Sequence, residues 1–274
     1  MMMCWICLRI CPSRAIMELN YRQYSEVGVP VLVLHGLFGS LSNWGWHCKQ
    51  LAERYAVYGV DLRNHGDSGH SDQLDYQVMA EDVRELIIRL GFKSCCIVGH
   101  SMGGKVAMQL ALSFPDLVDK LVVVDIAPVS YPEDADGHMN VLAAMDAVKL
   151  DEIKSRTEAE VTLKDYIPEE ATRKFVLTNL VRNREGLFEW RLHKDAIREN
   201  YPALRTELVA TQSFPKPVLF VKGCLSPYIK SEHEAQIKEL FPAASIKLIM
   251  DAGHWLHAEQ PQALQKILLK FLQS

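Results

Sequence analysis

The sequence has 274 residues, enough for one large hydrophobic core or for one domain that carries a sizeable insertion. Its 49% hydrophobic residues exclude disordered and fibrous proteins, and its net charge of −4 leaves no basic concentration that would favour a nucleic-acid partner. No apolar stretch reaches the roughly 18 residues of a membrane span. We therefore expect a globular protein, without stable membrane insertion, whose partner is a small molecule.

Residues 1–16 (MMMCWICLRICPSRAI) do not fit the pattern of the remaining chain. Their apolar patch has no positive charge before it and is too short for a signal peptide. Cys4, Cys7 and Cys11 lack the fourth ligand and the paired spacing of a zinc site, so we expect no metal. The seven cysteines form no regular framework, which predicts free thiols and a reducing, cytoplasmic location. We expect an unordered extension that can be removed, with Met17 as the working start.

Short apolar runs alternate with helical patterns in the first half of the chain. Apolar residues at the spacing of one helical face, followed by Gly91, predict a helix over residues 76–90, and a second helix is expected from about residue 102 to 114 before Pro115. The runs rich in β-branched residues predict buried strands. These strands are expected at residues 31–34, 55–62, 95–98 and 121–124.

The alternation stops after the fourth strand and returns near the end of the chain. Residues 129–213 show only helical patterns, whereas strands are again predicted at 217–221 and 246–249, with helices at 231–240 and 261–272. Strands separated by helix-length segments predict a mostly parallel sheet with helices on both faces. We expect an α/β core formed by residues 17–128 and 214–274, with residues 129–213 inserted as a helical lid.

The predicted lid carries apolar anchors at helical spacing. Met139, Leu142, Met145 and Trp190 are expected to present apolar faces to a substrate and to set the preferred chain length. The alternative is that these side chains pack the lid on itself.

Residues 99–104 (GHSMGG) give the strongest signal for chemistry. They contain the G-x-S-x-G pattern directly after a predicted strand and before a predicted helix, which is the context of a nucleophile elbow. Ser101 is therefore expected to be exposed at the start of a helix whose amides face developing negative charge. The alternative is a glycine-rich turn with a helix-capping serine.

Two further segments follow predicted strands and so belong at the carboxyl edge of the sheet. Residues 35–40 (HGLFGS) can supply a backbone amide to an oxyanion hole together with the amide of Met102; we expect Leu37 to be this donor, with Phe38 in reserve. His35 is expected to orient that loop. His254 follows the last strand and is expected to be the base that accepts the serine proton, because a serine hydroxyl alone is too weakly acidic.

Residues 61–69 (DLRNHGDSG) follow the second strand. This segment can be interpreted as an acidic or basic site. We favour a tight loop in which Asp61 and Arg63 are bonded to neighbouring backbone, because Asp, Asn and Gly are typical of such turns.

In combination and order, these motifs resemble the α/β-hydrolase superfamily, from about residue 18 to the end. The likeness is closer to the bacterial YbfF-type esterases, which also share residues 125–129 (DIAPV) and 223–228 (GCLSPY). The resemblance implies cleavage of short- to medium-chain acyl esters without a cofactor.

One position departs from the superfamily pattern. Ser226 stands where the acid of the catalytic triad is expected. We expect Asp125, at the end of the strand beside the elbow, to supply the carboxylate to His254, in preference to Asp251, Glu259 or Asp67. In the alternative, Ser226 bonds to His254 and Asp125 caps the lid entrance.

The predicted function is a serine esterase that forms an acyl-enzyme on Ser101. The alternatives are the same fold acting as a non-hydrolytic lyase or perhydrolase, or a ligand-sensing protein that hydrolyses slowly. The sequence does not determine the oligomeric state.

Overall fold

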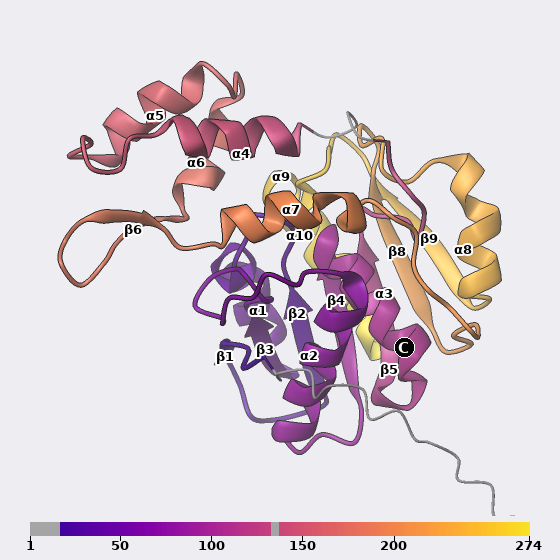
Figure 1. The fold of residues 1–274 in the computed structure, drawn as a ribbon. Coiled ribbons are helices and arrows are strands. Elements are labelled where there is room, and N and C mark those ends of the chain that lie inside the picture. The colour runs from indigo at the N-terminus through magenta and orange to yellow at the C-terminus, as the bar shows by residue number, and fades with distance from the viewer. Residues whose placement is uncertain (1–16, 133–136) are drawn as a thin grey trace, which may run out of the picture.

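The computed structural model describes residues 17–132 and 137–274, which are built around a seven-stranded sheet (Figure 1). The strand order is β1-β3-β2-β4-β5-β8-β9; β1 pairs antiparallel with β3, and the other pairs are parallel. The predicted parallel sheet is confirmed. Its strands are β1 (Tyr21–Gln23), β2 (Pro30–Leu34), β3 (Ala56–Val60), β4 (Cys95–His100), β5 (Val118–Val124), β8 (Val218–Gly223) and β9 (Ala244–Ile249).

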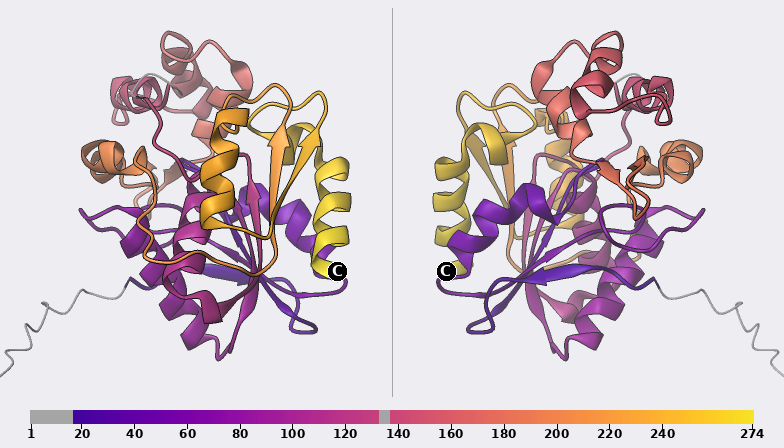
Figure 2. Two further views of the ribbon diagram at one scale, coloured as in Figure 1. Left: turned by 90° about the vertical axis from the view of Figure 1, so that its right-hand side faces the viewer. Right: turned by 90° about the vertical axis from the view of Figure 1, so that its left-hand side faces the viewer.

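Successive side chains of each strand enter different hydrophobic cores, because strand residues alternate between the two faces of a sheet. On β2, Leu32 and Leu34 pack in the core that contains α2 and α3, whereas Val31 and Val33 pack in the core that contains α1 and α10. Figure 2 shows helices on both sides of the sheet. The helices are α1 (Gly45–Leu51), α2 (Tyr76–Arg89), α3 (Met102–Ser113), α8 (Glu234–Leu240), α9 (Leu256–Glu259) and α10 (Pro261–Gln273).

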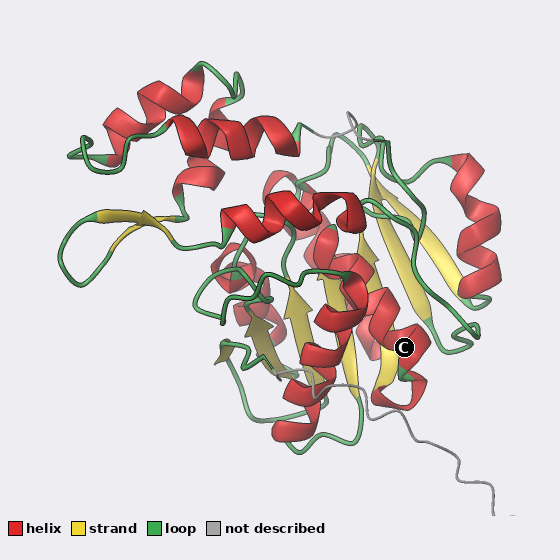
Figure 3. Cartoon of the chain, viewed as in Figure 1, coloured by secondary structure: helices red, strands yellow, loops and turns green. Residues whose placement is uncertain are grey.

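The segment between β5 and β8 forms a separate group of elements above the carboxyl ends of the strands (Figures 1 and 3). We call residues 129–213 the inserted segment. The prediction that it holds no strand was wrong, because β6 pairs antiparallel with β7. Each strand has only three residues, too few to show an alternating pattern. The elements are α4 (His138–Ala147), α5 (Arg156–Lys164), α6 (Glu170–Leu177), β6 (Leu180–Arg182), β7 (Phe188–Trp190) and α7 (Lys194–Leu204).

Lys105 joins the inserted segment to the core. Its side chain is 1% exposed, and its ammonium group donates to the carbonyls of Val129 and Thr206, at 2.8 and 2.6 Å. The same group lies 5.2 and 5.0 Å from the ring centroids of Tyr76 and Tyr131. Burial lowers its pKa to about 7. One buried amino group therefore bonds to the inserted segment at Val129, where the segment begins, and at Thr206, near its end.

Some predictions fall outside these observations. The extension of residues 1–16, with Cys4, Cys7 and Cys11, lies outside the described residues. Among the residues that are described, Cys48, Cys95, Cys96 and Cys224 carry free thiols, and no helix is long and apolar enough to cross a membrane.

Candidate active site

Ser101 lies in a sharp turn between β4 and α3. Its φ of 51° is unusual for a residue with a side chain, and it immediately precedes the helix. A Cβ on Gly99 would lie 2.2 Å from the carbonyl oxygen of Gly103, and one on Gly103 would lie 2.4 Å from that of His35. Both flanking glycines are therefore required by close backbone approach, which is the geometry that G-x-S-x-G predicts.

His254 lies between Ser101 and Asp125. Its Nε2 is 3.0 Å from the Ser101 hydroxyl oxygen, and its Nδ1 is 2.8 Å from Oδ2 of Asp125. The Tyr228 ring stacks on the imidazole, with centroids 4.1 Å apart, and Nε2 of His100 lies 2.9 Å from the His254 carbonyl oxygen. These contacts fix both the ring and its backbone, and they suit the tautomer in which Nδ1 carries the proton.

The Asp125 carboxylate is fully buried at the end of β5. Besides His254, it accepts hydrogen bonds from the amide of Gly223, at 3.0 Å, and from the hydroxyl of Ser226. Ser226 therefore contacts the carboxylate and not the imidazole, and its hydroxyl supports Asp125. The structure brings together all three side chains that the sequence assigned to one site.

Of the other acids considered for this role, Glu259 and Asp67 have different partners for their carboxylates, and the contact of Asp251 is made by its backbone amide. The Asp251 amide lies 3.1 Å from the Cys224 sulfur, and the Glu259 carboxylate accepts the amide of Gly253. The Asp67 carboxylate lies 3.6 Å from the Arg191 guanidinium. None of the three is paired with His254 within the described residues.

The amides of the loop after β2 differ in whether they have an acceptor. The Phe38 amide donates to Nε2 of His65 at 3.2 Å, so the reserve assignment of Phe38 to an oxyanion hole conflicts with the geometry. The described residues place no acceptor on the amides of Leu37 or Met102. The Phe38 carbonyl accepts from the side chain of Asn179, a buried residue before β6. No sequence signal pointed to Asn179.

Two buried histidines hold that loop. His35 lies 2.8 Å through Nδ1 from the Gly36 carbonyl, and its Nε2 accepts the Leu62 amide at 3.0 Å. Burial lowers the pKa of His35 and lowers that of His65 to about 3, so both rings are neutral at neutral pH. A neutral ring can accept at one nitrogen while donating at the other. His35 therefore has the orienting position expected from the sequence.

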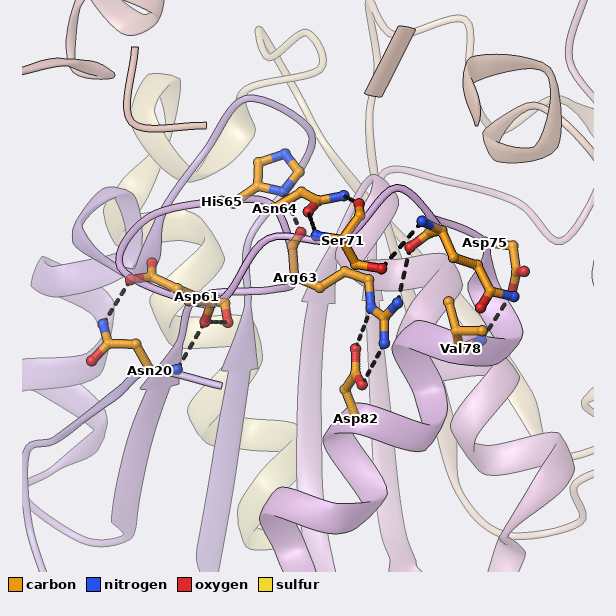
Figure 4. Close-up of polar contacts among 11 residues, drawn as sticks. Asn20, Asp61, Arg63, Asn64, His65, Ser71, Asp75, Val78 and Asp82 are labelled. Atoms are coloured by element: carbon orange, nitrogen blue, oxygen red, sulfur yellow. Dashed lines mark hydrogen bonds and ion pairs between the residues drawn. The ribbon is translucent and has the colours of Figure 1, made fainter. Parts of the chain in front are cut away.

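The loop of residues 61–69 forms a polar network with neighbouring residues, among them Asn20, Ser71 and Asp82 (Figure 4). Asp61 accepts the amides of Leu41 and Asp67, at 2.7 and 3.0 Å, as predicted for a backbone-bonded turn. The prediction for Arg63 was incomplete: it donates to the Gln73 carbonyl but also forms a buried bidentate pair with Asp82 of α2, at 2.6 and 2.7 Å. The network fixes the end of β3 against α2.

A cavity of about 570 Å³ opens beside Ser101 under the inserted segment. The side chains that line it from α4 are His138 and Val141, whereas Leu142 and Met145 do not line it and are buried in the hydrophobic core. The expectation that Leu142 and Met145 face a substrate is therefore replaced by the alternative, packing of the segment on itself. Helix α6 also lines the cavity, through Ala171, Lys174 and Phe175, and Thr178 lines it directly after the helix.

This arrangement supports one kind of chemistry well. A hydroxyl within reach of an imidazole, which is in turn bonded to a buried carboxylate, can be activated for attack on a carbonyl carbon. The amides of Leu37 and Met102, which have no acceptor among the described residues, are available to stabilise the oxyanion that forms.

Residues 29–261 match the family model described as alpha/beta hydrolase fold, so the chain belongs to the alpha/beta hydrolase family. Within that family it is similar to named esterases and lipases. The sn-1-specific diacylglycerol lipase ABHD11 of Mus musculus is 40% identical over 255 residues, 90% of this chain and 82% of that protein. Esterase YbfF of Escherichia coli (strain K12) is 34% identical over 263 residues, 93% of this chain and 99% of that protein.

A solved structure extends the likeness to three dimensions. A marine microorganism esterase has a TM-score of 0.91 at 39% identity and covers 93% of this chain and 99% of its own. These similarities confirm the resemblance to YbfF-type esterases that the motifs indicated. The chain is an ester hydrolase.

Proposed function

We propose that this protein hydrolyses short- to medium-chain carboxylic esters through an acyl-enzyme formed on Ser101. The observation that carries the proposal is the chain of contacts from Ser101 through His254 to Asp125, at 3.0 and 2.8 Å. The resemblance of the protein to enzymes named esterase supports the substrate class.

The first half of the reaction forms the acyl-enzyme. Ser101 Oγ attacks the ester carbonyl carbon while Nε2 of His254 takes the hydroxyl proton. The carbonyl oxygen becomes an oxyanion, held by the amides of Met102 and Leu37. Asp125 stabilises the imidazolium of His254. The imidazolium then gives its proton to the alkoxy oxygen, and the alcohol leaves.

The second half releases the acid. A water molecule attacks the acyl carbon while His254 takes one of its protons, and the second tetrahedral intermediate collapses with the proton returned to Ser101 Oγ. The chain's own residues supply every group in this sequence, so we propose that it uses no cofactor. We also propose that residues 17–128 and 214–274 form the catalytic core, with residues 129–213 as its lid, and that the enzyme is cytoplasmic.

Labelling of Ser101 by a fluorophosphonate probe tests the proposal. Ser101→Ala is expected to abolish labelling and to lower turnover of p-nitrophenyl acetate by a factor on the order of 10³ or more. Ser113→Ala, at the other end of the same helix, is the matched control and should keep both. Near wild-type turnover by Ser101→Ala would refute the assignment of Ser101 as the nucleophile. If the wild-type protein is labelled by the probe but hydrolyses the ester only slowly, the result would indicate a ligand sensor.

A further inference from the structure

Ser101 lies between two cavities of very different size. The cavity of about 570 Å³ is lined by Ser101 and His254, and a second cavity of about 30 Å³ is lined by Ser101 and Met102. His254 does not line the small cavity, although Tyr228, which stacks on it, does. The two cavities also share Leu37, whose amide we assign to the oxyanion. The reacting carbonyl therefore lies where the cavities meet.

The proton transfers determine which part of an ester can enter each cavity. The leaving alkoxy oxygen must receive its proton from Nε2 of His254, so the alcohol part has to extend on the side that His254 lines. The carbonyl oxygen occupies the space near the amides of Leu37 and Met102. The remaining substituent of the carbonyl carbon, the acyl chain, is directed into the cavity that His254 does not line.

The walls of the small cavity are held by hydrogen bonds between the core and the inserted segment. The hydroxyl of Tyr76 donates to the Leu204 carbonyl at 2.5 Å, and the hydroxyl of Tyr131 donates to the Tyr228 carbonyl at 2.7 Å. Lys105, which also lines the cavity, bonds to the inserted segment at Val129 and at Thr206. Expanding this cavity requires breaking buried polar contacts, which is costly.

The size and polarity of the small cavity limit the acyl chain. The small cavity has about 30 Å³ against about 570 Å³ for the large one, so it favours the shorter of the two substituents of an ester. Lys105 and Arg205 also line the small cavity. A longer alkyl chain would contact these polar groups without forming a hydrogen bond to them, which is unfavourable.

The large cavity suits a long apolar group. Its walls include the rings of Phe38, Trp44 and Tyr228, and the ring pair of Phe175 and Trp255, whose centroids are 4.9 Å apart. This pair joins α6 of the inserted segment to the loop that carries His254. Apolar groups with many carbons gain most from burial against such surfaces.

We propose that the enzyme is selective for esters of a very short acid, acetyl or propionyl, with a long apolar alcohol. The inference rests on the proposed acyl-enzyme function and narrows its substrate class. The small cavity is the acyl site and the large cavity is the alcohol site.

Pairs of isomeric esters test this division directly. Octyl acetate and ethyl octanoate have the same atoms and the same apolar surface, but they place the long chain on opposite sides of the ester bond. The expected kcat/KM is at least tenfold higher for octyl acetate, because even one misfitting methylene in a fixed pocket costs about that factor. Hexyl acetate and ethyl hexanoate should repeat the order.

Leu204 offers a variant that changes the acyl site alone. It lines only the small cavity of the two, and Leu204→Ala is expected to raise kcat/KM for ethyl octanoate severalfold while octyl acetate changes little. Leu163→Ala, an equally apolar and fully buried position in α5 that lines neither cavity, is the control for loss of packing. In the large cavity, Ala171→Phe should lower kcat/KM for octyl acetate more than for ethyl acetate.

The outcomes separate this inference from the proposed function. Hydrolysis of both isomers at equal rates, or faster hydrolysis of ethyl octanoate, would overturn the division of the cavities while leaving the esterase function intact. Failure to hydrolyse any of the four esters, together with no labelling of Ser101 by a fluorophosphonate, would overturn both.

Discussion

Replacing Asp125 by asparagine tests the position at which the chain departs from the family pattern, because Ser226 occupies the place where a carboxylate is usual. An asparagine side chain that keeps its oxygen for the Gly223 amide places its NH₂ group at the position of Oδ2, where it faces both His254 and Ser226. An NH₂ group facing Nδ1 favours the tautomer with its proton on Nε2. That tautomer cannot accept the Ser101 proton.

The two substitutions should differ widely in their effect on turnover. Asp125→Asn removes both the correct tautomer and the charge that stabilises the imidazolium, and we expect kcat to fall by a factor on the order of 10² to 10⁴, about 3 to 5 kcal/mol in the barrier. Ser226→Ala removes one hydrogen bond to a carboxylate that keeps its charge. Such a bond contributes about 1.5 to 3 kcal/mol, shared between ground and transition states, so we expect a loss within about tenfold.

The assay is the steady-state hydrolysis of p-nitrophenyl acetate by both variants, beside their fluorophosphonate labelling rates. Thermal melting checks that each variant is folded, since both substitutions alter a buried network. A larger loss for Ser226→Ala than for Asp125→Asn, with both proteins folded, would refute the assignment of Asp125.

Two further predictions concern stability. Arg63→Met should destabilise the fold by about 3 to 5 kcal/mol, measured by urea unfolding, because it leaves the Asp82 carboxylate buried without its partner. The double variant with Asp82→Leu should regain most of that loss, and no regain would show that the ion pair is not the cause. Burial lowers the pKa of His257 to about 3. As the pH drops below about 6.5, the histidine therefore binds a proton in the unfolded state before it does so in the folded state, and the free energy of unfolding decreases. The free energy of unfolding should decrease by about 1.4 kcal/mol per pH unit down to about pH 4. The decrease, measured by urea unfolding at each pH, should be smaller in His257→Phe, and identical pH profiles for the two proteins would contradict this role of His257.

More of the active site than of the inserted segment could be predicted from the sequence. GHSMGG between a strand and a helix specifies a turn that only glycine can flank, and this requirement is visible in sequence because it is local. Asp125 and His254 could be placed because the ends of parallel strands meet at one edge. The contact of Ser226 with Asp125 could not, since the sequence does not tell whether the Ser226 hydroxyl faces the carboxylate or the imidazole.

For the inserted segment, the hydrophobic periodicity predicted helices but not what their apolar faces contact. The spacing of Leu142 and Met145 correctly indicated an apolar helix face, but the same pattern serves packing against other helices and contact with a substrate. In α6 the residues over the cavity mix polar and apolar side chains: Ala171, Thr172, Lys174, Phe175 and Val176. A cavity wall need not be buried by protein, so it leaves little trace in hydrophobic patterning. The three-residue strands β6 and β7 are too short to leave an alternating pattern in the sequence.

Lys105 sets a rule for exchanging inserted segments between related hydrolases. Its ammonium holds the carbonyls of Val129 and Thr206, while its amide donates to the Ser101 carbonyl at 3.1 Å. The inserted segment, at Val129 and Thr206, and the turn that carries Ser101 are thus all bonded to one residue. Both acceptors are main-chain carbonyls, so a chimaera joined outside Val129 and Thr206 keeps them only if the foreign backbone follows the same path beside Lys105. Junctions placed between these two residues keep the native backbone at both acceptors, so we expect a foreign segment to be tolerated best there.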